Sequence, residues 1–585
     1  MNLNFMKLRE QMENQKVSYY LVPSEDPHQS EYVDDYFKCR QYISGFTGSA
    51  GTFLAGCEEG WLWTDGRYFT QAEGQISSDI TLMKQGVSGV PTILEFLKEH
   101  LQEGDTLGVN GFTISASYGK KIAKLVKQHG ASFRFDLRFV EELWAKDDRP
   151  AITKSTIYRH DIKYSGEHTD SKLARVREKM KELDANAFFL SSLPDIAWLF
   201  NLRGDDIACA PLFYSYAWIT IDKCFLFLRK DCISAVAFQR FKEHGISILD
   251  YTEVSAFLKD QHETVLLNPD LTNYLHYNLL FKCKIIEDKN PTELMKAIKN
   301  DIQACHINDG IAMTKFMYWL KKNVGKIPMT ERMISDHLEE ERKKLPDYMG
   351  PSFETICAYK DHAAMMHYQS TEESDVDVKA EGMLLIDSGG QYYGGTTDVT
   401  RTFILGPISE EERKYFTLVL KSMLTLANAK FLFGCRGSNL DILAREPLWE
   451  DGVDYRCGTG HGVGYFLGVH EGPNAFRWRS NPENLDAVLQ PGMVITDEPG
   501  VYVPGKYGIR TENMLICKKW QQNEYGAFLH FEPLTLVPID LDGVDLSLFN
   551  EKEKQLLTDY QQFVYDTLSP HLNEEESAWL HTLTL

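Results

Sequence analysis

Two aspartates stand inside a stretch of sequence that otherwise has the composition of a buried β-hairpin. The segment MLLIDSGGQYYGGTTDVTRTF, residues 383–403, places Asp387 after three aliphatic residues and Asp398 before a Val-Thr-Arg-Thr-Phe run. Glycines lie between the two acids, and glycine is favoured where a chain turns tightly. The pattern predicts strand, turn and strand, with carboxylates where core residues are expected. Because an unpaired buried carboxylate costs several kcal/mol, a fold that accepts this hairpin must compensate both charges.

The same surroundings recur further along the chain. GTGHGVGYFLGVHEGP carries His461 and His470, and GMVITDEPGVYV carries Glu498 at the end of an apolar run. YGIRTENMLIC places Glu512 in another apolar strand, beside Arg510. Each residue alone has an ordinary structural alternative: an aspartate in a turn, a packed loop histidine, or a glutamate that ends a strand. Their occurrence together, in runs typical of sheet core, favours a shared function.

Four buried carboxylates and one imidazole hold more negative charge than one neighbouring arginine neutralises. A pair of divalent metal ions about 3.5–4 Å apart, held by bridging carboxylates, is the arrangement of two-metal hydrolases. Oxygen donors with a single imidazole favour a hard ion such as Mn²⁺ over Zn²⁺. The sequence therefore predicts a site for two divalent metal ions, with Mn²⁺ as the expected metal and Co²⁺ or Zn²⁺ as alternatives.

The composition is that of an ordinary globular protein and excludes some partners. The chain has 585 residues and a formal net charge of −22. Such a surface argues against nucleic acid and anionic membranes, because phosphate binding relies on lysine and arginine. The N-terminal MNLNFMKLREQMENQK predicts a helix and not a signal peptide, and no apolar run approaches the ~18 residues of a membrane span. Eleven scattered cysteines without a CxxC pair indicate reduced thiols and a cytoplasmic location.

The length and the order of elements predict three domains. The expected ranges are residues 1–150, 165–291 and 292–585. The first two share one plan, which is helix, apolar strand, helix, ISGFTG or LFNLRG, and a further strand. This repetition predicts an internal duplication of an α/β domain. An alternative is that any two α/β domains share such a rhythm.

The third domain has two clear helix signals. The segment from Thr292 keeps the helical period only in part, so a break near Gly310 is expected. The second helix follows Ser409, which forms a capping box with Glu412. Strands and helices alternate here without a regular βαβ order, which favours an α+β domain.

Four segments together resemble the metallopeptidases with the pita-bread fold. They are SFETICAYKDHAAMMHY, LIDSGGQYYGGTTDVTRTF, GTGHGVGYFLGVHEGP and TDEPGVYVPGKYGIRTEN. The narrower resemblance is to the large, three-domain aminopeptidase P family (Xaa-Pro aminopeptidases), because VPSEDPHQSEY, SGFTGSAGT, WTDGRYF and LSPHLNEEESAWLHTLT also fit that pattern. The resemblance covers nearly the whole chain. It implies two creatinase-N-like α/β domains, a pita-bread α+β catalytic domain and a homodimer.

The resemblance also implies which residues hold the metal ions. Asp398 and Glu512 would be bridging carboxylates in a set of five ligands: Asp387, Asp398, His461, Glu498 and Glu512. Glu498 would also be the general base. The family commonly has a histidine four residues before the ligand histidine, where this chain has Cys457. The thiol is read as a small buried side chain or, less in keeping with a complete set of hard ligands, as a soft metal ligand.

Four further residues look like substrate contacts by the same resemblance. His367 and His470 would contact the substrate and steady the tetrahedral intermediate. Arg67 resembles a substrate-contacting arginine of the first domain, and Arg510 resembles a residue near the proline pocket.

The implied reaction is metal-assisted hydrolysis of the bond between the first residue of a peptide and a proline in second position. The same fold includes prolidases, which cleave only dipeptides, and creatinase, which uses no metal. It also includes non-catalytic peptide-binding modules, which have usually lost metal ligands. The complete ligand set disfavours creatinase and the modules, and the first two domains together with the C-terminal tail disfavour prolidase.

Overall fold

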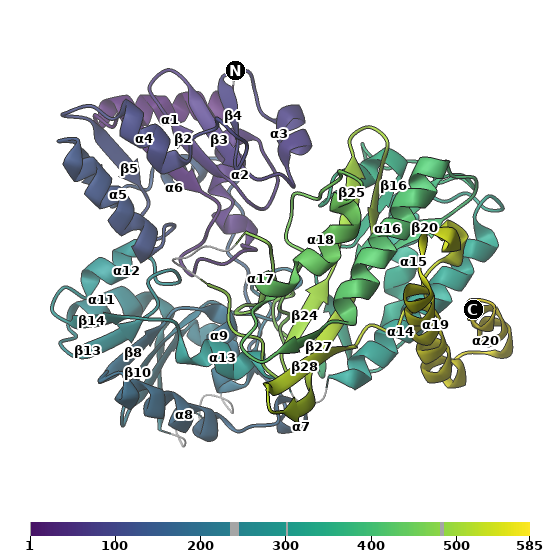
Figure 1. Cartoon of the computed structure of the whole chain (residues 1–585). Helices are drawn as coiled ribbons and strands as arrows, with labels where there is room; N and C mark the ends of the chain where they lie inside the picture. The colour runs from purple at the N-terminus through teal and green to yellow at the C-terminus, as the bar shows by residue number, and fades with distance from the viewer. Residues whose placement is uncertain (1, 234–240, 242–244, 300–301, 480–484, 585) are drawn as a thin grey trace. The chain divides into compact units, whose positions relative to one another are not determined.

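The chain divides into two units, Met1–Glu293 and Leu294–Leu585, each with its own sheets and helices (Figure 1). The computed structural model describes residues 2–233, 241, 245–299, 302–479 and 485–584. The boundary between the units falls within α13 (Pro291–Ala297). The three domain ranges expected from the sequence stay predictions.

A mixed sheet of six strands, in the order β4-β3-β2-β1-β5-β6, forms the N-terminal part of the first unit. The strands are β1 (Tyr19–Pro23), β2 (Thr52–Ala55), β3 (Gly60–Thr64), β4 (Ile80–Lys84), β5 (Thr106–Val109) and β6 (Ser132–Arg134). β1 pairs antiparallel with β2 and parallel with β5. One apolar cluster joins the sheet to α1 (Leu3–Asn14), α2 (Cys39–Ser44) and α6 (Phe139–Trp144), and another joins it to α4 (Ile93–His100) and α5 (Ala116–Gln128). Helices on both faces of a sheet are the arrangement of an α/β domain.

The second sheet repeats this connectivity, in the order β12-β11-β10-β8-β13-β14. The strands are β8 (Ala187–Leu190), β10 (Ser215–Thr220), β11 (Cys224–Leu228), β12 (Ile246–Asp250), β13 (Thr264–Leu267) and β14 (Lys284–Glu287). β8 has the place of β1, since it pairs antiparallel with β10 and parallel with β13. The helices are α7 (Ile162–Ser165), α8 (Thr169–Glu182), α9 (Leu193–Phe200), α11 (Val254–Lys259) and α12 (Tyr274–Leu279). The repeated order of elements predicted from the sequence is therefore confirmed.

The second unit builds its sheets from antiparallel strands. Their orders are β15-β18-β19, β16-β17-β20 and β21-β28-β27-β24, and β22 pairs with β23 and β25 with β26. The strands include β15 (Tyr348–Pro351), β16 (Ile356–Tyr359), β17 (Met383–Ser388), β18 (Gly390–Tyr392), β19 (Gly395–Thr396), β20 (Val399–Ile404) and β21 (Lys430–Leu432). They continue with β22 (Gly460–His461), β23 (Ala475–Phe476), β24 (Val494–Asp497), β25 (Gly500–Val503), β26 (Tyr507–Arg510), β27 (Asn513–Asn523) and β28 (Gly526–Pro533). Antiparallel sheets with helices packed beside them make the predicted α+β domain.

The expected helix break near Gly310 is wrong. Residues 303–323 form one continuous helix, α14 (Gln303–Asn323), which contains Gly310, and the helix before it, α13, ends at Ala297. Gly310 is a packing position, because a Cβ there would lie 2.4 Å from the carbonyl oxygen of Leu536. Gly310 weakens the periodic pattern because it allows the segment around Leu536 to pack closely against the helix. The local sequence does not show this tertiary contact.

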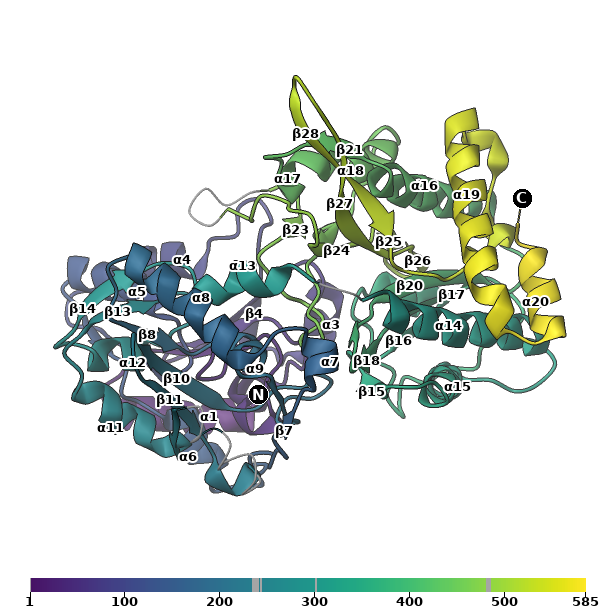
Figure 2. The same cartoon turned by 90° about the horizontal axis from the view of Figure 1, so that it is seen from below.

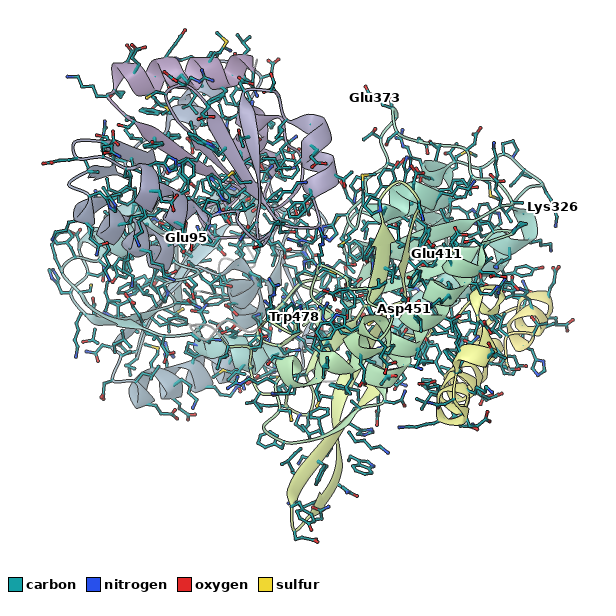
Figure 3. All side chains as sticks on the ribbon, turned by 45° about the horizontal axis from the view of Figure 1, so that its top comes forward. Glu95, Lys326, Glu373, Glu411, Asp451 and Trp478 are labelled. Atoms are coloured by element: carbon teal, nitrogen blue, oxygen red, sulfur yellow. The ribbon has the colours of Figure 1, made fainter. Side chains whose placement is uncertain are left out.

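The helix after Ser409 forms as predicted. α16 (Glu410–Ala427) begins with the reciprocal capping box of Ser409 and Glu412 and buries the predicted face, Phe416, Val419, Leu420, Met423 and Ala427. It packs along α18 (Ile442–Trp449) and against β24 (Figure 1). Its first turn carries Glu411, labelled in Figure 3, which accepts a hydrogen bond from the Tyr507 hydroxyl at 2.7 Å.

Further helices of the second unit pack on α14 and α16, since α19 (Glu551–Leu568) contacts both of them. α19 and α20 (Glu574–His581) pack together near the C-terminus, and α20 also contacts α14 (Figure 2). α15 (Glu331–Lys343) packs against α14, and the 3₁₀ helix η4 (Lys360–Ala364) packs against β26. Within the described residues, none of the helices has the length and apolar character that crossing a bilayer requires.

Candidate metal centre

A β-hairpin brings the first two predicted acids together. β17 and β20 pair antiparallel, with Asp387 opposite Thr400 in the register. Asp398 directly precedes β20, and the short strands β18 and β19 form the excursion between the two long ones. Both aspartates are buried. The chain thus folds back through its glycines, as the sequence predicts.

The other three predicted ligands come from a second group of strands. His461 ends β22, Glu498 follows β24, and Glu512 lies between β26 and β27. β24 and β27 pair antiparallel, so Glu498 and Glu512 lie at the same end of that strand pair. The Glu512 amide donates to the carbonyl oxygen of Thr400 at 3.1 Å, which joins this strand pair to the hairpin.

The side chains of these residues meet in one cluster. Asp398, His461 and Glu512 each present a ligand atom within 4.8 Å of the other two. His461 Nε2 lies 3.4 Å from Asp398 Oδ2 and 3.4 Å from Glu498 Oε1. The nearby charges of Asp398 and Glu498 both raise the pKa of Asp387. The five predicted ligands are therefore neighbours, although their role as ligands stays a prediction.

Burial and neighbouring charges shift the pKa values of the residues in the cluster. Burial raises the pKa of Asp387 to about 6, and burial together with the charge of Asp398 raises the pKa of Glu498 and of Glu512. Burial alone would lower the pKa of His461, but its interactions with Asp398 and Glu498 raise that pKa to about 9. Neighbouring carboxylates that oppose one another's ionisation are typical of functional sites.

The residues of the cluster fit a pair of divalent metal ions. Asp387 Oδ1 is buried and accepts no hydrogen bond from any residue in the described part of the chain. A buried carboxylate oxygen in that state is costly unless a cation meets it. The donors around it are carboxylate oxygens and one imidazole, which suit a divalent ion.

Arg510 lies beside the cluster and is fully engaged with the protein. Its Nε donates to Thr400 Oγ1 at 3.0 Å and its Nη1 to the Tyr502 hydroxyl at 2.7 Å, while Nη2 donates to Asp387 Oδ2. The guanidinium therefore fixes groups around the candidate metal ligands. A direct contact between Arg510 and substrate stays a prediction.

The other expected substrate contacts have different surroundings. The His470 ring lies 4.2 Å from the His461 ring, centroid to centroid, and so belongs to the cluster. His367 is half-buried in the segment after η4, next to Tyr368, whose hydroxyl donates to Glu331 at 2.8 Å. Arg67 is in the first unit, where Nε and Nη2 each donate to Asp65 at 2.8 Å.

Cys457 lies partly buried beside an apolar cluster that includes Tyr455 and Val501. The thiol contacts apolar side chains, as expected of a small hydrophobic residue, but it is only partly buried and not the buried side chain of that interpretation. The group of metal-capable residues found among the described residues consists of Asp398, His461 and Glu512 and does not include the thiol.

Comparisons with known proteins match this arrangement along the whole chain. A model of metallopeptidase family M24 matches residues 300–519, and a model of the C-terminal region of that peptidase family matches residues 527–585. Models of the creatinase/prolidase N-terminal domain match residues 5–134 and 148–303.

A probable Xaa-Pro aminopeptidase P from Paracoccidioides brasiliensis (strain Pb03) is 37% identical over 602 residues, covering 98% of this chain and 97% of the relative. The chain belongs to metallopeptidase family M24. A probable Xaa-Pro aminopeptidase P from Talaromyces marneffei is 38% identical over 604 residues, 98% of this chain and 91% of the relative. The crystal structure of an X-prolyl aminopeptidase from Caenorhabditis elegans, described as a cytosolic enzyme with a dinuclear active site, has a TM-score of 0.94 and 33% identity, covering 100% of this chain and 99% of that one.

Several polar residues around the centre of this M24 peptidase are missed by sequence reasoning. Thr400 and Thr496 are buried and donate hydrogen bonds to Glu512 and Glu498. Thr400 lies two residues after Asp398, and Thr496 lies two residues before Glu498. Residues two apart in an extended chain lie on the same face, so this spacing was the signal that could have identified the two threonines as neighbours of the ligands. A buried threonine in a strand is so common that this spacing alone distinguishes nothing.

A buried ion cluster fixes the segment that carries His470. The next residue, Glu471, lies 2.8 Å from Lys299 Nζ and 3.4 Å from Lys296 Nζ, and all three side chains are almost fully buried. The Glu471 amide donates to the carbonyl oxygen of Gly462, which directly follows His461. The cluster thus connects the loop between the two histidines to the start of the second unit.

Glu471→Gln is expected to lower the thermal midpoint by about 5 °C or more. The change leaves two buried ammonium groups without their carboxylate, and breaking a buried pair costs about 3–5 kcal/mol. Differential scanning calorimetry measures the shift. Glu340→Gln, at an exposed carboxylate 2.8 Å from Lys343, is the matched control and should change the midpoint by about 1 °C or less. Equal midpoints for Glu471→Gln and the unmodified protein contradict the assignment.

Proposed function

We propose that this M24 peptidase is a metal-dependent Xaa-Pro aminopeptidase, which hydrolyses the bond between the first residue of a peptide and a proline in second position. The observation that carries the proposal is the buried cluster of four carboxylates and one imidazole, in which Asp387 Oδ1 accepts no hydrogen bond from a described residue. Relatives that bear the name Xaa-Pro aminopeptidase P cover nearly the whole chain, including both N-terminal sheets. Both the cluster and the similarity along the whole chain agree with a metal-dependent peptidase that recognises the N-terminus of a peptide and a proline in second position.

Five residues would hold two divalent ions: Asp387, Asp398, His461, Glu498 and Glu512. When bound, such ions polarise the scissile carbonyl and lower the pKa of an attacking water from ~15.7 towards 7. We propose Mn²⁺ as the metal, because the donor set is mostly carboxylate oxygen.

Glu498 is the proposed general base. Its carboxylate lies at the edge of the cluster, with Oε1 3.4 Å from His461 Nε2, and burial raises its pKa, which makes the carboxylate a better proton acceptor. Glu498 accepts the proton of the attacking water. It then delivers this proton to the departing proline nitrogen, because a secondary amine leaves only when protonated.

Two histidines and one arginine have proposed roles on the substrate. His470, next to His461, donates to the carbonyl oxygen as negative charge develops there. His367 orients the peptide, and Arg67 contacts it. Proline requires such dedicated contacts, because its tertiary amide offers no N–H and its ring fixes φ.

An activity assay with two substrates tests the proposed function. The protein is expected to release arginine from Arg-Pro-Pro in the presence of Mn²⁺, and to lose this activity when a chelator removes the metal. Gly-Pro is offered in parallel. Turnover of the dipeptide alone identifies a prolidase, and metal binding without turnover of either peptide identifies a non-catalytic peptide-binding module.

A cytoplasmic location and a homodimer complete the proposal. The location is supported by the Caenorhabditis elegans enzyme, which is described as cytosolic. The homodimer is an implication of the family resemblance, and analytical ultracentrifugation tests it. A sedimentation coefficient of a 67.1 kDa monomer at micromolar concentration argues against it.

A further inference from the structure

We propose that two buried threonine hydroxyls, those of Thr400 and Thr496, act as positioning residues that orient the carboxylates of Glu512 and Glu498 for metal binding. Both side chains are fully buried, and each hydroxyl makes two hydrogen bonds inside the cluster. The inference deepens the proposed function and rests on it, because it concerns how the same five ligands are held.

Thr400 stands between a cation and a carboxylate. Its Oγ1 accepts from Arg510 Nε at 3.0 Å and donates to Glu512 Oε2 at 2.7 Å. A guanidinium N–H can only donate, so the hydroxyl oxygen must accept there. The single hydroxyl proton is then available for Glu512 alone. The hydrogen bonds therefore run in one direction, from the Arg510 guanidinium, which can only donate, through the Thr400 hydroxyl to the Glu512 carboxylate.

The same arginine reaches a second candidate ligand directly. Arg510 Nη2 donates to Asp387 Oδ2, and Thr400 is opposite Asp387 in the β17–β20 register. The Glu512 amide also donates to the Thr400 carbonyl. Thr400 therefore holds Glu512 by both backbone and side chain on the strand pair that carries Asp387, and one hydrogen-bond network joins the two carboxylates.

Thr496 repeats this pattern on the other group of strands. Its Oγ1 accepts from the His461 amide at 3.0 Å and donates to Glu498 Oε1 at 3.1 Å. A backbone N–H is likewise only a donor, so the hydroxyl proton is directed to Glu498. Thr496 links the backbone of one candidate ligand to the side chain of another.

Glutamate is the ligand type that most needs such support. Its side chain has one more rotatable bond than aspartate, so fixing it costs more conformational entropy. A hydroxyl bound to one carboxylate oxygen restricts the carboxylate plane before any metal arrives. Loss of outer partners of this kind lowers metal affinity about 10–100-fold in metalloproteins.

Titration of the metal-free protein with Mn²⁺ tests the inference, using calorimetry and a readout that needs no catalysis. Thr400→Val and Thr496→Val keep the branched shape and remove the hydroxyl. Each is expected to raise the Kd for Mn²⁺ by tenfold or more. Thr400→Ser and Thr496→Ser keep the hydroxyl and are expected to bind within about threefold of the unmodified protein, since the hydrogen bonds are retained.

Thr417→Val is the matched control. Thr417 is buried on α16, accepts from the Asp545 amide at 2.9 Å and donates to the Arg413 carbonyl at 2.8 Å. This variant also loses one accepted and one donated hydrogen bond, both to backbone groups away from the cluster, and its Kd for Mn²⁺ should equal that of the unmodified protein. Where a valine variant does not fold, Thr400→Ala and Thr496→Ala, which add no bulk, decide by the same tenfold criterion.

The outcomes separate the inference from the proposed function. If the unmodified protein binds no Mn²⁺, Co²⁺ or Zn²⁺, the proposed function fails. If it binds Mn²⁺ and the folded valine or alanine variants bind within twofold of it, the positioning role is overturned and the metal site stands. A serine variant that binds as weakly as its valine counterpart also overturns the role, because the hydroxyl is then not what matters.

Discussion

Asp398→Ala is expected to lower kcat/KM for Arg-Pro-Pro by about a thousandfold or more and to abolish tight metal binding. Asp398 and Glu512 are the two expected bridging carboxylates, and Asp398 Oδ2 lies 3.4 Å from His461 Nε2. Removing a principal group of a catalytic site costs enzymes on the order of 10³–10⁶ in turnover. The loss should appear in kcat and persist at saturating substrate and Mn²⁺.

The same variant should stay folded, which separates a catalytic from a structural defect. In the metal-free protein Asp398 repels the buried charges of Glu498 and Glu512 but attracts charged His461, so its removal relieves one interaction and loses the other. The midpoint of thermal unfolding without metal is therefore expected to stay within a few degrees of that of the metal-free unmodified protein. Asp559→Ala, at an exposed position on α19, is the control with unchanged activity. An Asp398→Ala variant with normal kcat/KM removes the basis of the proposed site.

The sequence predicts the candidate ligands because each breaks its own local pattern. Asp387 and Asp398 flank a glycine-rich hairpin, and Glu498 follows a strand that is otherwise apolar. A carboxylate in such a place requires a cation, and the number of carboxylates requires more cationic charge than the neighbouring arginine supplies. This argument needs only the pattern of apolar residues in each strand, which can be recognised from neighbouring residues in the sequence.

The partners that hold those ligands could not be predicted, because they are distant in sequence. Glu471 and Lys299 are 172 residues apart, and Thr400 and Glu512 are 112 apart. Their contacts depend on how strands of different sheets are placed. Nothing in the neighbourhood of a threonine or lysine marks it as a partner of one particular carboxylate. The helix break expected at Gly310 failed for the same reason, since the feature there is contact with Leu536.

The candidate metal ligands of the metal-free protein are expected to destabilise the fold less as the pH falls from about 9 to about 5. The pKa of Asp387 is about 6 in the folded chain, and the pKa values of Glu498 and Glu512 are also raised. Above these values the folded cluster is charged and repulsive. As the pH falls through them, the folded state binds protons before the unfolded state does, since unfolded carboxylates titrate near pH 4. The contribution of these carboxylates to stability therefore rises with falling pH in this window.

His461 acts in the same direction. Its folded pKa is about 9, above the value of ~6.5 in an unfolded chain. The stabilisation from its charged form is complete below pH ~6.5 and is lost as the pH rises through 9. The contribution of Asp387 alone is on the order of 3 kcal/mol, since each pKa unit corresponds to about 1.4 kcal/mol and its pKa moves from 3.8 to about 6.

Thermal midpoints measured in chelator at pH 6 and pH 8.5 should thus differ by several degrees, with the higher midpoint at pH 6. Saturating Mn²⁺ should raise the midpoint most at the higher pH, because bound metal takes the place of the protons and compensates the charge at every pH. Asp387→Asn isolates the cause: it removes one titrating charge, so its metal-free midpoint should depend less on pH than that of the unmodified protein. Two results would contradict this prediction: a metal-free midpoint that rises from pH 6 to pH 8.5, or an Asp387→Asn variant with the full pH dependence of the unmodified protein. Either result means that the buried carboxylates do not carry the mutually repelling charge that a metal ion is expected to compensate.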